Sequence, residues 1–172
     1  MPYTLEIVRD PFPANPREEF DHVFTLHFTN NRYISGDETI TPDRPLDPSG
    51  LIVFPVFAYI HSGVALSVAP FSCPWDSGQI GYATVSKADF LREFFGDSAR
   101  LLTKARRARA LEVLKSELEE FQAYIDGDVF GYVIKDADDN EIFSCWGYYG
   151  EQYAEEDGQA HLESLEAKEQ AA

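Results

Sequence analysis

The stretch TKARRARALEVLKSELEEFQAYIDG, residues 103–127, decides the fold class of this chain. Its large apolar side chains recur every three or four residues, which places them along one face of a helix. They are Leu111, Leu114, Leu118, Phe121 and Ile125. The same stripe is expected to continue toward the start of the helix through Leu101, Ala105 and Ala108. With Gly127 as a C-terminal stop, the pattern predicts one long amphipathic helix over residues 103–125.

Segments on both sides of this helix alternate apolar and polar residues, which is typical of half-buried strands. The pattern predicts strands at residues 3–8, 23–29 and 79–85, and hairpins at residues 51–69 and 129–146. Ser86 is placed to cap a short helix that begins at Lys87 and ends before Gly96. The predicted fold class is α+β: an antiparallel sheet of about five to seven strands packed against one long helix, with a short helix and an acidic C-terminal helical tail.

Length and composition indicate one domain with an appendage. A chain of 172 residues can bury roughly 70% of its unfolded surface, and 44% hydrophobic residues supply a core without a metal or disulfide staple. No repeat and no linker divides the sequence. We therefore expect a single α+β domain over residues 1–150 and an acidic, weakly docked helical tail over residues 151–172.

The N-terminus, the longest apolar run and the number of cysteines indicate where in the cell the protein is located. The N-terminus lacks a basic segment followed by an apolar stretch, so no signal peptide is predicted. The longest apolar run, residues 51–60, is interrupted by Pro55 and is too short to span a bilayer. Two cysteines in 172 residues fit a reducing compartment. A cytoplasmic location without membrane contact is the expectation.

The net charge of −16 is concentrated in the last third of the chain. Residues 1–111 hold 13 acidic and 11 basic side chains, whereas residues 112–172 hold 17 acidic and 3 basic ones. Such a field repels nucleic acid and anionic membranes and attracts basic partners. The plain alternative is that the charge keeps the protein soluble or reflects a salt-adapted cytoplasm. Salt adaptation, however, would acidify the whole surface.

Motifs for metal or cofactor chemistry are missing from the sequence. The four histidines are scattered, and neither cysteine has a partner at the spacing of zinc ligands. There is no phosphate-binding glycine loop, no dinucleotide fingerprint and no nucleophile elbow. The acidic turn before Glu141 lacks the twelve-residue calcium loop. We expect no metal site, no cofactor and no catalytic residue.

Two further features are ambiguous at this level. Cys73 and Cys145 have acidic rather than basic neighbours, which favours structural thiols over nucleophiles. Five cations without an intervening acid begin the long helix; they are Arg100, Lys104, Arg106, Arg107 and Arg109. We expect them to face the acidic C-terminal third of the chain, or a second copy of it in a homodimer.

Two segments are more informative about the protein family than the overall composition is: CPWDSGQIGY at residues 73–82 and SCWGYYG at residues 144–150. Between them lie LKSELEEF at residues 114–121 and GDVFGY at residues 127–132. In this order they resemble a family of small, mostly uncharacterised acidic proteins encoded on phages, plasmids and other mobile elements. The resemblance covers about residues 51–150 and brings no catalytic residues with it. It implies that Trp75 and Trp146 are core or inter-strand anchors and that the glycines form tight turns.

A mobile-element origin favours an anti-defence protein, such as an anti-restriction or anti-CRISPR inhibitor, that presents carboxylates where phosphates would lie. The expected partner is a basic nucleic-acid-binding host protein or complex, with no direct binding of nucleic acid. The predicted partner-binding residues are Glu112, Glu119, Asp126, Asp136, Asp138, Asp139, Glu155, Glu156 and Asp157. The alternative is an accessory protein with a structural or regulatory interaction role, and an unrecognised enzyme stands third.

Overall fold

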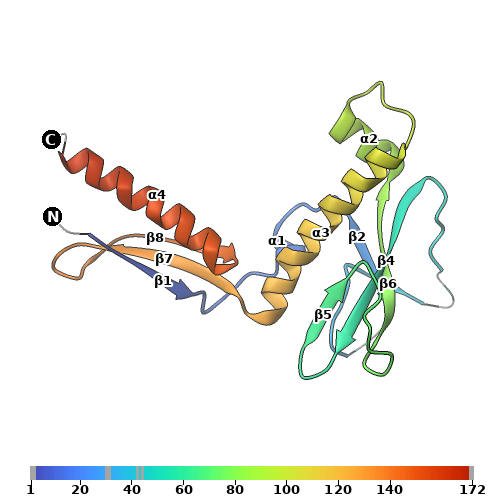
Figure 1. Cartoon of the computed structure of the whole chain (residues 1–172), viewed down its shortest axis with the longest axis horizontal. Helices are drawn as coiled ribbons and strands as arrows, with labels where there is room; N and C mark the ends of the chain where they lie inside the picture. Colours follow the sequence, from blue (N-terminus) through green and yellow to red (C-terminus); the bar gives the residue numbers. More distant parts are fainter. Residues whose placement is uncertain (1–2, 30–31, 42, 44, 171–172) are drawn as a thin grey trace. The chain divides into compact units, whose positions relative to one another are not determined.

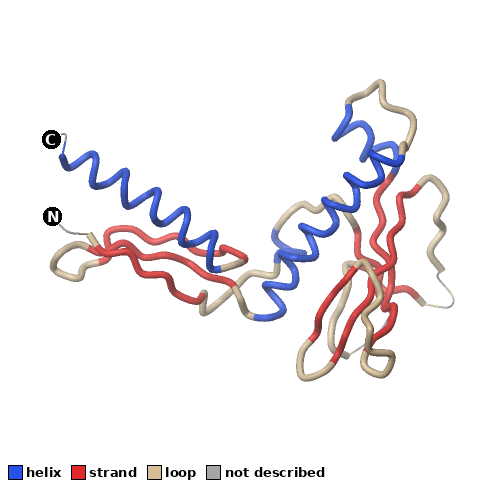
Figure 2. The backbone as a smooth tube through the Cα atoms, viewed as in Figure 1, coloured by secondary structure: helices blue, strands red, loops and turns tan. Residues whose placement is uncertain are grey.

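The computed structural model describes residues 3–29, 32–41, 43 and 45–170 (Figure 1). The chain divides into two compact units. Unit 1 joins both ends of the chain, residues 1–18 and 123–172, and unit 2 comprises residues 19–122. This division differs from the single domain of residues 1–150 with a separate tail that the sequence suggested. Within the described residues there are eight strands and four helices, in the order β1-α1-β2-β3-β4-β5-β6-α2-α3-β7-β8-α4. Figure 2 shows the helices and strands in different colours.

Unit 1 contains a three-stranded antiparallel sheet with the order β1-β7-β8. The strands are β1 (Thr4–Arg9), β7 (Val129–Lys135) and β8 (Glu141–Tyr149). β1 pairs with β7 from Thr4 opposite Lys135 to Arg9 opposite Phe130, so the first strand of the chain completes a sheet formed by its last hairpin. Helix α4 (Glu151–Gln170) packs along this sheet (Figure 1).

Small residues allow α4 to approach the sheet closely. Ala154 and Gly158 are buried on the side of the helix that contacts the strands. A Cβ atom at Gly158 would lie 2.9 Å from Leu5 Cδ1 and 3.0 Å from Tyr132 Cγ. One turn further on, the ring of His161 meets that of Phe143 edge-on, with centroids 4.1 Å apart. The C-terminal helix is confirmed. Its docking depends on small residues, which a search for large apolar side chains misses.

Unit 2 contains a five-stranded sheet with the order β3-β2-β6-β4-β5. Its strands are β2 (Thr25–Thr29), β3 (Glu38–Ile40), β4 (Leu51–Ile60), β5 (Val64–Ser67) and β6 (Ser77–Ser86). β2 and β3 are parallel, and the other neighbours are antiparallel. β5 pairs only with residues 57–60 of β4, and the register shifts between Val56 and Phe57. Proline lacks a ladder donor, so Pro55 predicts either an edge strand or a bulge, and the structure has a register shift one residue later.

The remaining helices are α1 (Pro16–Glu19), α2 (Lys87–Phe95) and α3 (Lys104–Asp126). Ser86 caps α2, because its Oγ accepts a hydrogen bond from the amide of Asp89. Gly96 ends α2 and Gly127 ends α3, both with positive φ angles of 83° and 71°. The predicted short and long helices are therefore confirmed.

The apolar stripe of α3 is shorter than predicted. Ala110, Leu114, Leu118 and Phe121 are buried, whereas Leu111 and Ile125 are half-buried. Leu101 lies before the helix and is 68% exposed, and Ala105 and Ala108 are exposed as well. The predicted extension of the stripe toward residue 101 is thus wrong, since the first turns of α3 stand clear of the apolar core.

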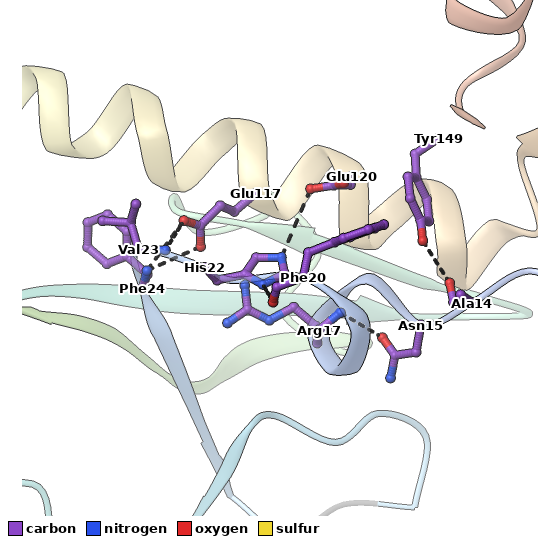
Figure 3. Close-up of polar contacts among 10 residues, drawn as sticks. All are labelled: Ala14, Asn15, Arg17, Phe20, His22, Val23, Phe24, Glu117, Glu120 and Tyr149. Atoms are coloured by element: carbon purple, nitrogen blue, oxygen red, sulfur yellow. Dashed lines mark hydrogen bonds and ion pairs between the residues drawn. The ribbon is translucent and has the colours of Figure 1, made fainter. Parts of the chain in front are cut away.

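Polar side chains join α3 to the backbone of strands in unit 2. The Glu117 carboxylate accepts hydrogen bonds from the amides of Val23, at 2.7 Å, and Phe24, at 3.3 Å (Figure 3). The Gln122 side chain donates to the carbonyl of Val64 and accepts from the amide of Leu66, at 2.7 and 2.9 Å. These contacts satisfy backbone groups at the start of β2 and along the outer strand β5.

The prediction of an α+β fold is confirmed, but the arrangement is not one sheet of five to seven strands against one long helix. The strands form two sheets, of three and five strands. Alternation of polar and apolar residues identifies strands but carries no information about which strands pair. Strand β3, inside the segment 35–50 that reads as a loop, adds a short parallel edge that the sequence did not indicate.

We expect Gly158→Val to destabilise the protein by about 1–3 kcal/mol, because the new side chain overpacks the contact with Leu5 and Tyr132. Chemical denaturation measures the loss. Ala160→Val is the matched control on the same helix, at an exposed position. Valine has a higher helix propensity than glycine but a lower one than alanine. Helix propensity alone would therefore favour Gly158→Val over Ala160→Val, which is the opposite of the expected result. Equal losses in the two variants would contradict close docking of α4.

Candidate functional site

The acidic charge belongs mainly to unit 1. This unit holds 16 acidic and 4 basic side chains, for a net charge of −12, whereas unit 2 holds 14 acidic and 10 basic ones, for a net charge of −4. The predicted partner-binding residues are divided between the units. Glu112 and Glu119 lie in unit 2, and the other seven lie in unit 1. The candidate set is therefore not one surface, and the acids of unit 1 form its larger part.

Five carboxylates lie along one side of α4, and we call them the α4 acidic face: Glu151, Glu155, Glu156, Glu163 and Glu166. At 3.6 residues per turn they span less than half of the helix circumference. All five are exposed. In the part of the chain that the structure describes, none of them forms an ion pair; Glu163 accepts a hydrogen bond from the Gln159 amide at 3.2 Å. Of the predicted residues, Glu155 and Glu156 belong to this face.

Three other predicted residues take part in the unit's own structure. The Asp136 carboxylate accepts hydrogen bonds from the amides of Asp138 and Asn140, both at 2.9 Å, and those with Asn140 lower its pKa. Asp139 has a φ of 64° and pairs with Lys135 at 3.3 Å. Asp157 accepts a hydrogen bond from the Tyr148 hydroxyl. The hairpin turn uses Asp136 and Asp139 for its geometry, as such turns commonly do. Asp138 is exposed in the same hairpin turn, where its amide donates to Asp136.

The last three predicted residues, Glu112, Glu119 and Asp126, lie on α3. Glu112 is exposed and pairs with Arg109 at 3.3 Å, one turn away on the same helix. Glu119 and Asp126 are exposed on later turns. A pair between neighbouring exposed side chains is weak, so Glu112 remains accessible to solvent.

The Tyr148–Asp157 contact ties α4 to β8 and has an electrostatic consequence. Burial, followed by the hydrogen bond to Asp157, raises the pKa of the Tyr148 phenol above its ordinary value. Burial and the charge of Asp157 also raise the pKa of Tyr132. Both phenols therefore stay neutral in the folded protein at pH values where unfolded tyrosine ionises.

Cys73 and its neighbours do not form a nucleophilic triad. The Cys73 thiol lies 3.9 Å from Asp76 Oδ2, and the same oxygen lies 3.4 Å from His61 Nδ1. The carboxylate is thus placed between the thiol and the imidazole, whereas a cysteine nucleophile needs the imidazole in contact with sulfur. Cys145 lies on β8 opposite Tyr132, and both cysteines are free and half-buried.

His22 and His27 contact other elements of unit 2. His27 bridges Thr84 Oγ1 at 2.9 Å and Glu38 Oε2 at 3.2 Å on neighbouring strands. His22 lies 4.0 Å from Glu120 of α3 (Figure 3). Within the described ranges, no group of three or more His, Cys, Asp or Glu side chains is arranged to hold a metal ion.

The basic segment at the start of α3 is used within unit 2. Arg107 donates to the carbonyl of Val53 at 2.8 Å and lies over the Phe54 ring. Arg106 donates to the carbonyl of Leu101 and lies over Phe95. Among the described residues, the Arg109–Glu112 pair is the one contact of this segment with the acidic third of the sequence. Arg106 and Arg107 instead contact carbonyls and aromatic rings of unit 2, so they do not face the acidic third of their own chain. The alternative of a second copy in a homodimer stays a prediction.

The two tryptophans have different environments. Trp146 covers Gly131, where a Cβ atom would lie 2.3 Å from its Cε3, so the glycine is required for this contact. Trp146 is nevertheless 43% exposed. Trp75 is 90% exposed in the connection between β5 and β6. Trp146 is thus a sheet anchor, as the resemblance implied, but Trp75 is not a core residue.

No family model matches the chain, and no similar curated protein or solved structure was found. The resemblance to mobile-element proteins stays a prediction. No helix among the described residues is both long enough and apolar enough to cross a membrane.

We expect the free energy of unfolding to fall as the pH rises above about 10, the ordinary pKa of tyrosine. The raised pKa values of Tyr148 and Tyr132 mean that unfolding releases protons there, so their stabilising contribution is complete below pH 10 and is lost above it. Denaturation at several pH values, with tyrosinate absorbance as the titration signal, measures the effect. Tyr148→Phe should make the free energy of unfolding fall less steeply with pH in this range. An unchanged pH dependence in that variant would show that Tyr148 does not contribute to it.

Proposed function

We propose that this chain is a non-enzymatic acidic binding protein, and that the α4 acidic face occupies the basic, nucleic-acid-binding surface of another protein. An anti-defence inhibitor encoded by a mobile element, directed at a restriction or CRISPR complex, is the specific form of this proposal. The observation that carries it is the group of five exposed carboxylates on one side of α4, without an ion-pair partner in the described residues.

The charge of unit 1 supports an external basic partner. Cations of unit 1 are already engaged within it, such as Arg9 with Asp128 at 2.9 Å, and Lys135 with Glu6 and Asp139. Concentrated negative potential raises the rate of encounter with a positively charged surface and repels DNA and RNA. Affinity through such a surface should therefore be strongly salt-dependent.

The spacing on α4 suits an imitation of a phosphate strand. Carboxylates four residues apart, such as Glu151 and Glu155, are separated by about 6 Å along the helix axis. A DNA strand carries one phosphate per roughly 3.4 Å of axis. Successive carboxylates would then take the places of about every second phosphate. The α3 acids Glu112 and Glu119 lie in the other unit and are not needed for this arrangement.

The docking of α4 supports a preorganised surface. The helix contacts the sheet through Ala154 and Gly158, and the Tyr148–Asp157 and Tyr132–His161 hydrogen bonds hold its inner side. A helix held at several points presents its outer carboxylates with little loss of backbone entropy on binding.

We expect the combined substitutions Glu155→Gln, Glu156→Gln and Glu163→Gln to abolish capture of the partner from host lysate at physiological salt. Wild-type protein should retain the partner at low salt and release it progressively as salt is added, because the Debye length falls. Folding should be unchanged, since the three side chains are exposed. Affinity capture followed by identification of the retained protein is the measurement.

The matched control combines Asp21→Asn, Asp43→Asn and Glu93→Gln, which remove the same charge from exposed positions of unit 2. This control should retain the partner, and so should a Glu112→Gln, Glu119→Gln variant. DNA or RNA should compete with the protein for the partner. Simultaneous binding of nucleic acid and this protein, or equal loss of capture in the control, would exclude the proposal.

A further inference from the structure

Unit 2 contains a cavity of about 590 Å³ between the start of α2 and the loop that leads to α3. Its lining residues are Gly50, Lys87, Ala88, Leu91, Arg92, Asp97, Ala99 and Arg100. The volume lies in the range of small-molecule sites, which is about 300–1,000 Å³. The lining contains three cations and one carboxylate, the opposite of the balance in a chain whose net charge is −16.

The cations are held by contacts that leave them able to bind an anion. The backbone amide of Lys87 donates to the carbonyl of Gly50 at 2.9 Å, and within the described residues its ammonium group forms no ion pair. Arg100 donates through Nη1 to the carbonyls of Asp97 and Ala99, and its other N–H groups remain for a ligand. Arg92 pairs with Asp89 at 2.6 Å, which orients its guanidinium.

The helix end adds to this positive potential. Lys87 and Ala88 are the first two residues of α2, a nine-residue helix. Amide groups in the first turn of a helix have no acceptor within the helix, and the N-terminus carries partial positive charge. Anions bind readily at such ends. The amides of Lys87 and Asp89 already donate to the Gly50 carbonyl and to Ser86 Oγ, so the helix end contributes its partial positive charge beside the three cationic side chains rather than these two hydrogen bonds.

The other lining residues indicate what else the ligand contains. Leu91 and Ala99 are buried and give the cavity an apolar part. The Asp97 carboxylate is an acceptor beside the cations, and a carboxylate next to a phosphate site commonly binds sugar hydroxyls. A bare phosphate would use the cations and be repelled by Asp97, whereas a hydroxylated organic phosphate would use both.

We propose that this cavity binds a phosphorylated sugar, either free or as the sugar phosphate of a nucleotide. Lys87, Arg92 and Arg100 receive the phosphate, Asp97 accepts hydrogen bonds from the hydroxyl groups, and Leu91 contacts the apolar part of the ligand. The site lies in unit 2 and does not use the α4 acidic face, so it is independent of the proposed partner surface.

Isothermal titration calorimetry of the whole protein with ribose 5-phosphate, AMP, adenosine and inorganic phosphate tests the proposal. Ribose 5-phosphate and AMP should both bind, and adenosine and inorganic phosphate should bind at least tenfold more weakly. AMP binding more tightly than ribose 5-phosphate would identify the nucleotide as the source, and the reverse order would identify the free sugar phosphate.

Lys87→Ala should weaken binding about tenfold, as for loss of a hydrogen bond to a charged group. Lys104→Ala removes the same charge from an exposed position outside the cavity and should change affinity less than twofold.

Asp97→Asn gives a result that a general loss of structure cannot imitate. It should weaken ribose 5-phosphate binding and strengthen that of inorganic phosphate, because a repulsive charge and a hydroxyl acceptor are removed together. The backbone carbonyl of residue 97 can still accept the hydrogen bond from the Arg100 guanidinium in this variant. Absence of saturable binding by both sugar phosphates, equal affinity for inorganic phosphate, or tighter binding of single-stranded DNA through the same residues would overturn the proposal.

Discussion

The close contact between α4 and the β1-β7-β8 sheet is the constraint on which unit 1 depends. Gly158 leaves no room for a Cβ atom between the helix backbone, Leu5 and Tyr132. Ala154 occupies the preceding turn, fully buried. This contact covers the apolar side of the sheet with a helix that offers few large apolar residues. It also allows the same helix to carry five exposed carboxylates on one side, because packing is carried by small residues, aromatic rings and the Tyr148–Asp157 hydrogen bond.

The distribution of charge follows from chain topology. The acidic last third of the sequence folds together with the first strand, so most of its carboxylates belong to one unit. The hairpin residues Asp136 and Asp139 are used in turn geometry and in a contact with Lys135. The proposed partner surface therefore relies on the exposed carboxylates of α4, the helix that also packs on the sheet of unit 1.

Unit 2 distributes its charges differently. Glu117 and Gln122 of α3 bind strand backbone, and Arg106 and Arg107 bind carbonyls and lie over phenylalanine rings. Lys87, Arg92 and Arg100 instead line a cavity formed by α2 and the α2–α3 connection. The lining of this cavity is more basic than the chain as a whole. The cavity's volume, apolar floor and single carboxylate are the properties expected of a site for a small polar anion.

The sequence by itself determined the secondary structure well. The 3.6-residue repeat from Leu114 to Phe121, the Ser86 cap and the stops at Gly96 and Gly127 are local signals, and local backbone physics decides them. The same signals gave the α+β class and the acidic character of the C-terminal helix. Only the tertiary structure decided that β1 pairs with β7, that the strands form two sheets, and that the acids separate into two units. It also decided that Lys87 and Arg100 share a cavity. These features depend on contacts between residues distant in sequence, and hydrophobic periodicity records which face of an element is buried but not what covers it.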